Sequence, residues 1–361
     1  MSDGLFRGLK VFARRFTLAA MKLSMIALAL VVMLGVAGRE TPHGTIVASN
    51  MRDNTATVID AASGRVLATL PTGEAPHEVA TTHDGKWAVV SNYGTRERPG
   101  NSITVIDLSR LTVARTIDLG EYRRPHGMAF FPGDTSLAVT SEVSRAVVLV
   151  DFRDGRVIGT VPTNGRASHM LAMSAAGDEL FTTNIVDGSI SRLDVAKREA
   201  KRVIPVAKFV EGIAASPDGK RVWVGRNGDS IVVIVDTDAG RAIDTLRGFG
   251  IPYRLAVSHD GRSAIITDPA RGEVRVYDAI ARRQRLLIKI PRDSIVATAE
   301  VPGSPSPEGV TTSPDGRWAF VTLQGRNLVA TIDLQKGGIA GYAPTGTWSD
   351  GIAYSTLERR P

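Results

Sequence analysis

Short stretches of β-branched and aromatic residues recur along this chain, separated by turns that contain glycine or aspartate. The clearest copies are KWAVVSN (86–92), TSLAVTSE (135–142), DELFTTN (178–184), KRVWVGRN (220–227), RSAIITD (262–268) and RWAFVTLQ (317–324). Each is followed by a second stretch that ends in aspartate, such as ITVID (103–107), VVLVD (147–151) and IVVIVD (231–236). Patterns of this kind predict antiparallel β-strands joined by tight turns, in which the aspartates cap backbone amides.

A recurring phrase precedes each of these strands. It opens on a polar residue, continues through small apolar residues and ends in a turn. The copies are HEVATTHDG (77–85), HGMAFFPGD (126–134), HMLAMSAAG (169–177), EGIAASPDG (211–219), YRLAVSHDG (253–261), EGVTTSPDG (308–316) and a shortened DGIAYS (350–355). They are spaced 42 or 43 residues apart, with two longer spacings of 49 and 55. A repeat of this length predicts an all-β fold, a β-propeller with one four-stranded antiparallel blade per repeat.

The two ends of the repeat array complement each other. TIVASN (45–50), ATVID (56–60) and VLATLPT (66–72) supply three strands with no first strand before them, whereas 350–355 is a first strand with nothing after it. Joining them in one blade closes a ring of seven blades and removes exposed sheet edges. We therefore predict a seven-bladed propeller over residues 44–361, closed by three N-terminal strands and one C-terminal strand, with a linker at 39–43.

The first 38 residues have a different composition. Basic residues precede an uncharged apolar run from Leu23 to Ala37, which is typical of a secretory signal and short for a spanning helix. We expect residues 1–38 to be a signal peptide or an N-terminal membrane anchor, with Met21 as a possible true start. The protein is then exported to the periplasm or cell envelope, and it meets the membrane only through residues 16–38 if they are not cleaved.

Charge and cysteine content exclude several function classes. Residues 1–38 contain five basic and one acidic side chain, so without them the formal net charge falls from +7 to +3. No run of lysine or arginine remains, which gives no case for nucleic-acid binding. The chain has no cysteine, which excludes disulfides, thiolate catalysis and cysteine-ligated metals.

The repeated SPDG turns, the VID strands and the segments VVSN and FTTN resemble the YVTN-type seven-bladed β-propeller repeat family. The resemblance covers residues 44 to 361. It implies the fold but leaves the function open, because this family is similar both to binding propellers and to the propellers of lactonases, quinoprotein dehydrogenases and haem nitrite reductases.

The residues that open the seven phrases are expected to meet at one mouth of the central channel. Three of them are histidines on consecutive blades, and imidazoles in this number suit a zinc or copper site with an open position. The metal candidates are His77, His126 and His169, and the candidate catalytic residues are Glu211, Glu308, Tyr253 and Asp350. The alternative is that these polar residues only line a hydrated channel.

Arginines and two insertions fall on the same predicted face. Arg52, Arg226, Arg271 and Arg326 follow second strands and could bind a carboxylate or phosphate, unless they are solvated loop charges. The insertions cover Tyr93–Asn101 and Arg292–Ser306, and long excursions from a rigid scaffold are often functional.

These observations predict a protein that binds a small polar or anionic ligand, a metal or a periplasmic protein partner at the channel mouth. The alternative is a copper- or zinc-dependent enzyme, an oxidoreductase or a lactonase-like hydrolase, in which Glu211 or Glu308 acts as base and arginines orient an anionic substrate. A third possibility is an interaction scaffold that uses the outer faces of the blades.

Overall fold

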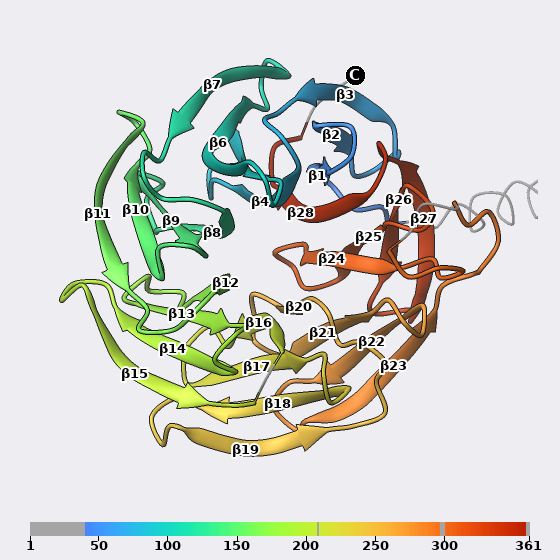
Figure 1. Cartoon of the computed structure of the whole chain (residues 1–361). Coiled ribbons are helices and arrows are strands. Elements are labelled where there is room, and N and C mark those ends of the chain that lie inside the picture. Colours follow the sequence, from blue (N-terminus) through green and yellow to red (C-terminus); the bar gives the residue numbers. More distant parts are fainter. Residues whose placement is uncertain (1–39, 208, 297–299, 359–361) are drawn as a thin grey trace, which may run out of the picture. The chain divides into compact units, whose positions relative to one another are not determined.

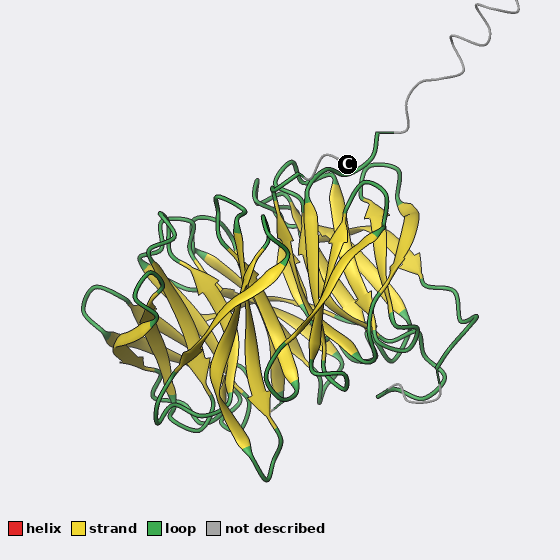
Figure 2. Cartoon of the chain, turned by 90° about the horizontal axis from the view of Figure 1, so that it is seen from above, coloured by secondary structure: helices red, strands yellow, loops and turns green. Residues whose placement is uncertain are grey.

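Seven four-stranded antiparallel sheets are arranged in a ring around a central axis (Figure 1). The computed structural model describes residues 40–207, 209–296 and 300–358. The strands run between the two faces of the ring, and the loops gather at these faces (Figure 2). The predicted all-β, seven-bladed fold is confirmed. The predicted signal or anchor at 1–38 lies outside the described residues. Within the described ranges there is no helix that could cross a membrane.

Blade 1 joins segments about 300 residues apart in the sequence. From the axis outward, its strands are β28 (Ser349–Ser355), β1 (Thr45–Asn50), β2 (Thr55–Asp60) and β3 (Val66–Pro71). Strand β1 pairs antiparallel with β28, and Thr45 lies opposite Ser355. The predicted closure by three strands plus one is therefore confirmed.

The other six blades follow one another along the chain, and each has its first strand innermost. Blades 2 and 3 are β4 (Pro76–Thr81), β5 (Trp87–Gly94), β6 (Pro99–Asp107), β7 (Thr112–Asp118) and β8 (Pro125–Phe130), β9 (Ser136–Ser141), β10 (Ala146–Asp151), β11 (Arg156–Pro162). Blades 4 and 5 are β12 (Ser168–Met173), β13 (Glu179–Asn184), β14 (Ser189–Asp194), β15 (Glu199–Pro205) and β16 (Val210–Ala215), β17 (Arg221–Arg226), β18 (Ile231–Asp236), β19 (Arg241–Leu246). Blades 6 and 7 are β20 (Leu255–Val257), β21 (Ser263–Asp268), β22 (Glu273–Asp278), β23 (Arg283–Lys289) and β24 (Pro307–Thr312), β25 (Trp318–Leu323), β26 (Leu328–Asp333), β27 (Gly338–Pro344).

The hydrophobic core lies between neighbouring blades. Between blades 2 and 3, Val89 and Ile103 pack with Leu137 and Val148 in one buried cluster. Burial of alternating side chains on both faces of the inner sheets explains why the second and third strands read as nearly continuous apolar runs. The predicted turn caps are also present: Asp107 Oδ1, for example, accepts a hydrogen bond of 2.9 Å from the amide of Arg110.

Hydroxyl groups on the second strands hold the inner strands of adjacent blades together. Each hydroxyl donates to the carbonyl of the residue that opens the next phrase. We call these contacts the axial latches, and they are Ser49 to His77, Thr140 to His169 (2.6 Å), Thr183 to Glu211 (3.0 Å), Thr267 to Glu308 (2.8 Å) and Thr322 to Asp350 (2.7 Å). The latches place the first residue of each of these phrases at the axis.

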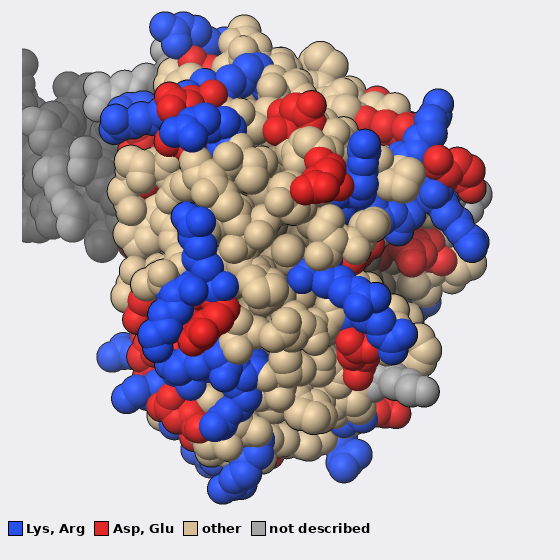
Figure 3. Space-filling view, turned by 60° about the vertical axis from the view of Figure 1, so that its left-hand side comes forward, with Lys and Arg blue, Asp and Glu red and all other residues tan. Residues whose placement is uncertain are grey.

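Charged side chains cover the outer strands of the blades. Arg156 in β11 and Lys201 and Arg202 in β15 are exposed. Figure 3, which brings the left-hand side of Figure 1 forward, shows basic and acidic side chains mixed on this face. Exposed charges on edge strands disfavour pairing with a second chain.

Candidate functional site

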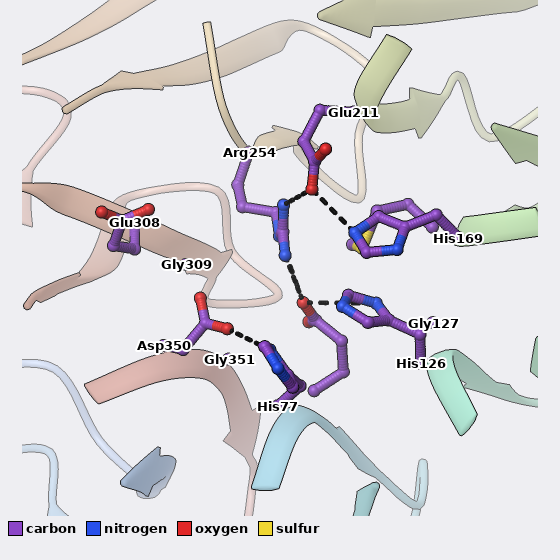
Figure 4. A network of polar contacts seen from close by, with 12 residues as sticks. His77, His126, Gly127, His169, Glu211, Arg254, Glu308, Gly309, Asp350 and Gly351 are labelled. Atoms are coloured by element: carbon purple, nitrogen blue, oxygen red, sulfur yellow. Dashed lines mark hydrogen bonds and ion pairs between the residues drawn. The ribbon is translucent and has the colours of Figure 1, made fainter. Parts of the chain in front are cut away.

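The residues that open the phrases converge at the axis, as the sequence predicts. His77, His126, His169, Glu211, Glu308 and Asp350 lie around one polar network, the axial cluster (Figure 4). His126, His169, Glu308 and Asp350 are buried, while His77 and Glu211 are half-buried. Tyr253 belongs to the same region, because its ring lies 4.2 Å below the guanidinium of Arg254.

His169 is held between two carboxylates. Its Nδ1 contacts Glu142 Oε1, and its Nε2 lies 2.7 Å from Glu211 Oε1. Burial opposes a charge on His169, but the flanking Glu211 and Glu142 raise its pKa to about 9. Burial also opposes ionisation of Glu211, yet His169 and Arg254 lower the pKa of Glu211 to about 2. At neutral pH, His169 is therefore an imidazolium that donates a hydrogen bond from each nitrogen.

Arg254 spans the axis. Its Nε and Nη2 donate to Glu78 Oε1 at 3.1 and 2.9 Å, and its Nη1 donates to Glu211 Oε1 at 3.0 Å. The side chain is only 4% exposed, so these ion pairs are largely removed from solvent. Arg254 thereby connects blade 6 with blade 2 and blade 5 through the centre of the ring.

Glu78 and Arg254 were not predicted from the sequence, although a signal for them exists. Four phrases have glycine in their second position, and there a Cβ would lie 2.1 to 2.5 Å from backbone atoms of the next blade. These glycines are Gly127, Gly212, Gly309 and Gly351. Glu78, Met170 and Arg254 replace glycine in the other three phrases. The departures from glycine therefore mark two of the charged residues at the axis.

His126 is neutral and lies between two other histidines. Its ring centroid is 3.6 Å from that of His169 and 5.1 Å from that of His77. Burial, together with the charge of its neighbours, holds the pKa of His126 well below its ordinary value. His126 Nδ1 is 3.9 Å from Glu78 Oε1, too far for a hydrogen bond, and has no hydrogen-bond partner in the described part of the chain.

Glu308 and Asp350 form the acidic side of the cluster, across from His126 and His169 (Figure 4). Ser306 donates to Glu308 Oε1 at 2.6 Å, and His77 Nδ1 lies 2.8 Å from Asp350 Oδ2. The other oxygens, Glu308 Oε2 and Asp350 Oδ1, are buried without a hydrogen-bond partner among the described residues. Burial and the adjacent Asp350 raise the pKa of Glu308 well above its ordinary value, which favours the protonated carboxyl group.

The two predicted insertions differ in structure. The first is largely an extension of β5 and β6, in which Gly94 pairs with Pro99, and its Tyr93 hydroxyl donates to Glu142 Oε2 at 2.7 Å. The second packs on blade 7, where the amide of Val296 donates to the carbonyl of Gly325 at 2.8 Å. Both insertions therefore reach the axial cluster, the first through Tyr93 and the second through Ser306.

The three histidines lie together, but their nitrogens do not form a metal-ligand set. Both nitrogens of His169 are engaged with carboxylates, and an imidazolium has no lone pair for a metal. Across the described ranges, no group of three or more His, Asp or Glu side chains is arranged to hold a metal ion. The predicted copper or zinc site stays a prediction.

The four predicted ligand-binding arginines have separate local partners. Arg52 lies over the ring of Trp348 at 3.8 Å, and Arg226 contacts Asp229. The other two contacts are Arg271 to Asp268 at 3.9 Å and Arg326 to Asp293 at 3.4 Å. The predicted anion site is therefore not assembled as one cluster, and it stays a prediction.

Known proteins share this fold. No family model matches the chain. It is 21% identical to Antigen Lp49 of Leptospira interrogans over 247 residues, which are 66% of this chain and 51% of that protein. It is 27% identical to the seven-bladed beta-propeller protein Rv1057 of Mycobacterium tuberculosis over 157 residues, 42% of this chain and 37% of that protein. The chain thus spans about half or less of the length of these relatives.

Two solved structures are similar in architecture. Hydrazine synthase of Kuenenia stuttgartiensis superposes with a TM-score of 0.66 at 20% identity, covering 80% of this chain and 92% of that chain. A functionally unknown protein from Desulfotomaculum acetoxidans gives a TM-score of 0.69 at 12% identity, covering 87% and 100%. Identities this low support the β-propeller fold alone, and the YVTN-type resemblance stays a prediction.

Proposed function

We propose that this propeller binds a small polar molecule at the axial cluster. The observation that carries the proposal is the set of buried polar atoms without a hydrogen-bond partner among the described residues: His126 Nδ1, Glu308 Oε2 and Asp350 Oδ1. Leaving one such atom unpaired costs about 1–3 kcal/mol, so three together on one axis favour a molecule that supplies the missing hydrogen bonds. The rigid ring of strands preorganises the cluster for this role.

Native mass spectrometry of the purified protein tests the proposal. We expect a bound small molecule that is retained under native conditions and released on denaturation. Asp350→Leu and Glu308→Leu should abolish retention, whereas Glu199→Leu, on the exposed outer strand β15, should retain the molecule. Wild-type protein that carries only water, and that no small polar compound stabilises, would contradict the proposal.

We further propose that the protein is exported and that residues 1–38 direct the export. The support is the basic segment followed by the apolar run from Leu23 to Ala37. N-terminal sequencing of protein from the native host should give a mature terminus close to Arg39 if the segment is cleaved. Recovery of full-length protein in the cytoplasmic fraction would overturn this assignment.

Metal-dependent catalysis has less support than ligand binding, because His169 lies between two carboxylates and is protonated. Elemental analysis of protein from its native compartment tests it directly. About one equivalent of copper or zinc, lost in His126→Ala, would favour the enzyme over the binding protein.

A further inference from the structure

The acidic side of the axial cluster gathers carboxyl groups with few cationic neighbours. Glu308 lies in β24 and Asp350 in β28, so two adjacent blades contribute one buried carboxyl group each. Glu300, in the second insertion, is exposed and near enough for its charge to raise the pKa of Glu308 further. Among the residues that the structure describes, only the side chains of Ser306 and His77 donate to this buried pair.

The cations of the cluster are engaged elsewhere. On the opposite side Arg254 bonds to Glu78 and Glu211, and His169 bonds to Glu211 and Glu142. Arg124 completes that side, because its Nη1 is 3.6 Å from Glu142 Oε2. Three carboxylates there face three cations: Glu78, Glu142 and Glu211 against Arg124, His169 and Arg254. The acidic side therefore holds the carboxylates of Asp350 and Glu300 and the carboxyl group of Glu308, whose raised pKa favours its protonated form, and His77 is their one ionic contact among the described residues.

We propose that the acidic side binds the primary ammonium group of a small organic cation, which donates hydrogen bonds to Glu308 Oε2 and Asp350 Oδ1. This inference rests on the proposed ligand-binding function and names the chemical class of the ligand. An ammonium group offers three N–H donors and a positive charge, which match two acceptor oxygens in an acidic environment. An anion would be repelled by the same carboxylates. Two buried carboxyl groups also supply too few oxygens for calcium, which takes six to eight.

Binding of a cation should release a proton from Glu308. The charged and titratable groups that face Glu308 are Asp350 from β28, Glu300 from the insertion, and Arg254 and Tyr253 from the segment just before β20. In the free protein, burial and the two carboxylates raise the pKa of Glu308 and favour its protonated form. A bound ammonium favours the carboxylate form, so the proton leaves Glu308 for the buffer.

Calorimetric titration of the purified protein with methylammonium chloride tests the inference. At pH 7, in phosphate and in MOPS, neither of which contains a primary ammonium group, the difference in binding heat gives the number of protons released. We expect release of about one proton for the wild type. Glu308→Gln should release no proton, and its affinity for methylammonium should be at least about tenfold lower than that of the wild type. Glu199→Gln, an exposed carboxylate on β15, should behave like the wild type. Sodium acetate, acetamide and sodium chloride serve as the anionic, neutral and ionic-strength controls.

The outcomes separate this inference from the function on which it rests. If acetate or acetamide binds in place of methylammonium, or if Glu308→Gln binds methylammonium as the wild type does, the ammonium assignment is wrong and ligand binding stands. If no probe binds and native mass spectra contain no bound molecule, both fail. Should Glu308→Gln not fold, the wild-type affinity measured from pH 6 to pH 8 replaces it. Proton release requires tighter binding as the pH rises, and a flat profile would contradict it.

Discussion

Replacing Arg254 with methionine should destabilise the ring severely. The substitution keeps most of the side-chain volume but removes both hydrogen bonds to Glu78 and the one to Glu211. Because Glu78 and Glu211 stay near the axis with little exposure, the variant leaves two carboxylates without their shared cation. Removing one partner of a buried ion pair typically costs about 3–5 kcal/mol. For a domain of this size that corresponds to a decrease in Tm of about 6 °C.

The loss should depend on pH with a defined sign. In the wild type, His169 and Arg254 together hold the pKa of Glu211 near 2, so this carboxylate contributes stability above its unfolded pKa. Without Arg254, the folded protein binds a proton on Glu211 more readily. The difference in stability between variant and wild type should therefore be largest near pH 7 and should shrink as the pH falls towards 4.

Urea denaturation followed by tryptophan fluorescence measures both effects. Arg156→Met, an exposed arginine on β11, is the matched control and should change stability by less than about 0.5 kcal/mol. Adding Glu78→Gln to Arg254→Met should restore part of the loss, because it removes one uncompensated charge. If Arg254→Met is within about 1 kcal/mol of the wild type at pH 7, the cross-axis ion pairs do not stabilise the fold as argued.

Three further predictions concern the axis. Thr183→Val removes a latch to the Glu211 carbonyl and an acceptor for the amide of Met170, so we expect a loss of about 1–3 kcal/mol in urea denaturation, which Thr183→Ser should largely avoid. Gly351→Ala places a Cβ 2.2 Å from the carbonyl oxygen of His77 and should lower Tm strongly, whereas Gly338→Ala meets no atom within 4 Å and should be nearly neutral by calorimetry. His169 contributes stability that is present below pH 6.5 and is lost as the pH rises through about 9, and NMR should follow its imidazolium over that range. A titration of this ring near pH 6 would refute the double ion pair.

The repeat made the ring and its axis predictable. The period of the phrases, the open blade at each end and the placement of His77, His126 and Asp350 at one axis all follow from counting antiparallel strands. Spacing alone could not predict which charges pair across the axis. Arg254 reaches Glu78 through space from a position 176 residues away, and that choice depends on the room left by the neighbouring side chains.

The peripheral arginines show a second limit of strand counting. Arg226 and Arg326 follow second strands as expected, but each contacts a carboxylate close to its own loop. A strand pattern gives the face on which a side chain emerges, whereas its direction depends on local partners. Tyr93 shows the same limit, because the sequence pattern places it in an insertion and does not reveal that β5 and β6 continue their pairing to Gly94 and Pro99.

Strand β28 makes the axial cluster depend on completed folding. It brings Asp350 to the axis only by pairing with β1, and the same carboxylate holds His77 in the neighbouring blade. A ring in which this strand is detached has six intact blades. It lacks Asp350 Oδ1 beside Glu308, and it also lacks the contact from Asp350 that orients His77. Binding of the proposed ligand should therefore appear abruptly, in the step that seals the last blade, and partly assembled molecules should not bind it.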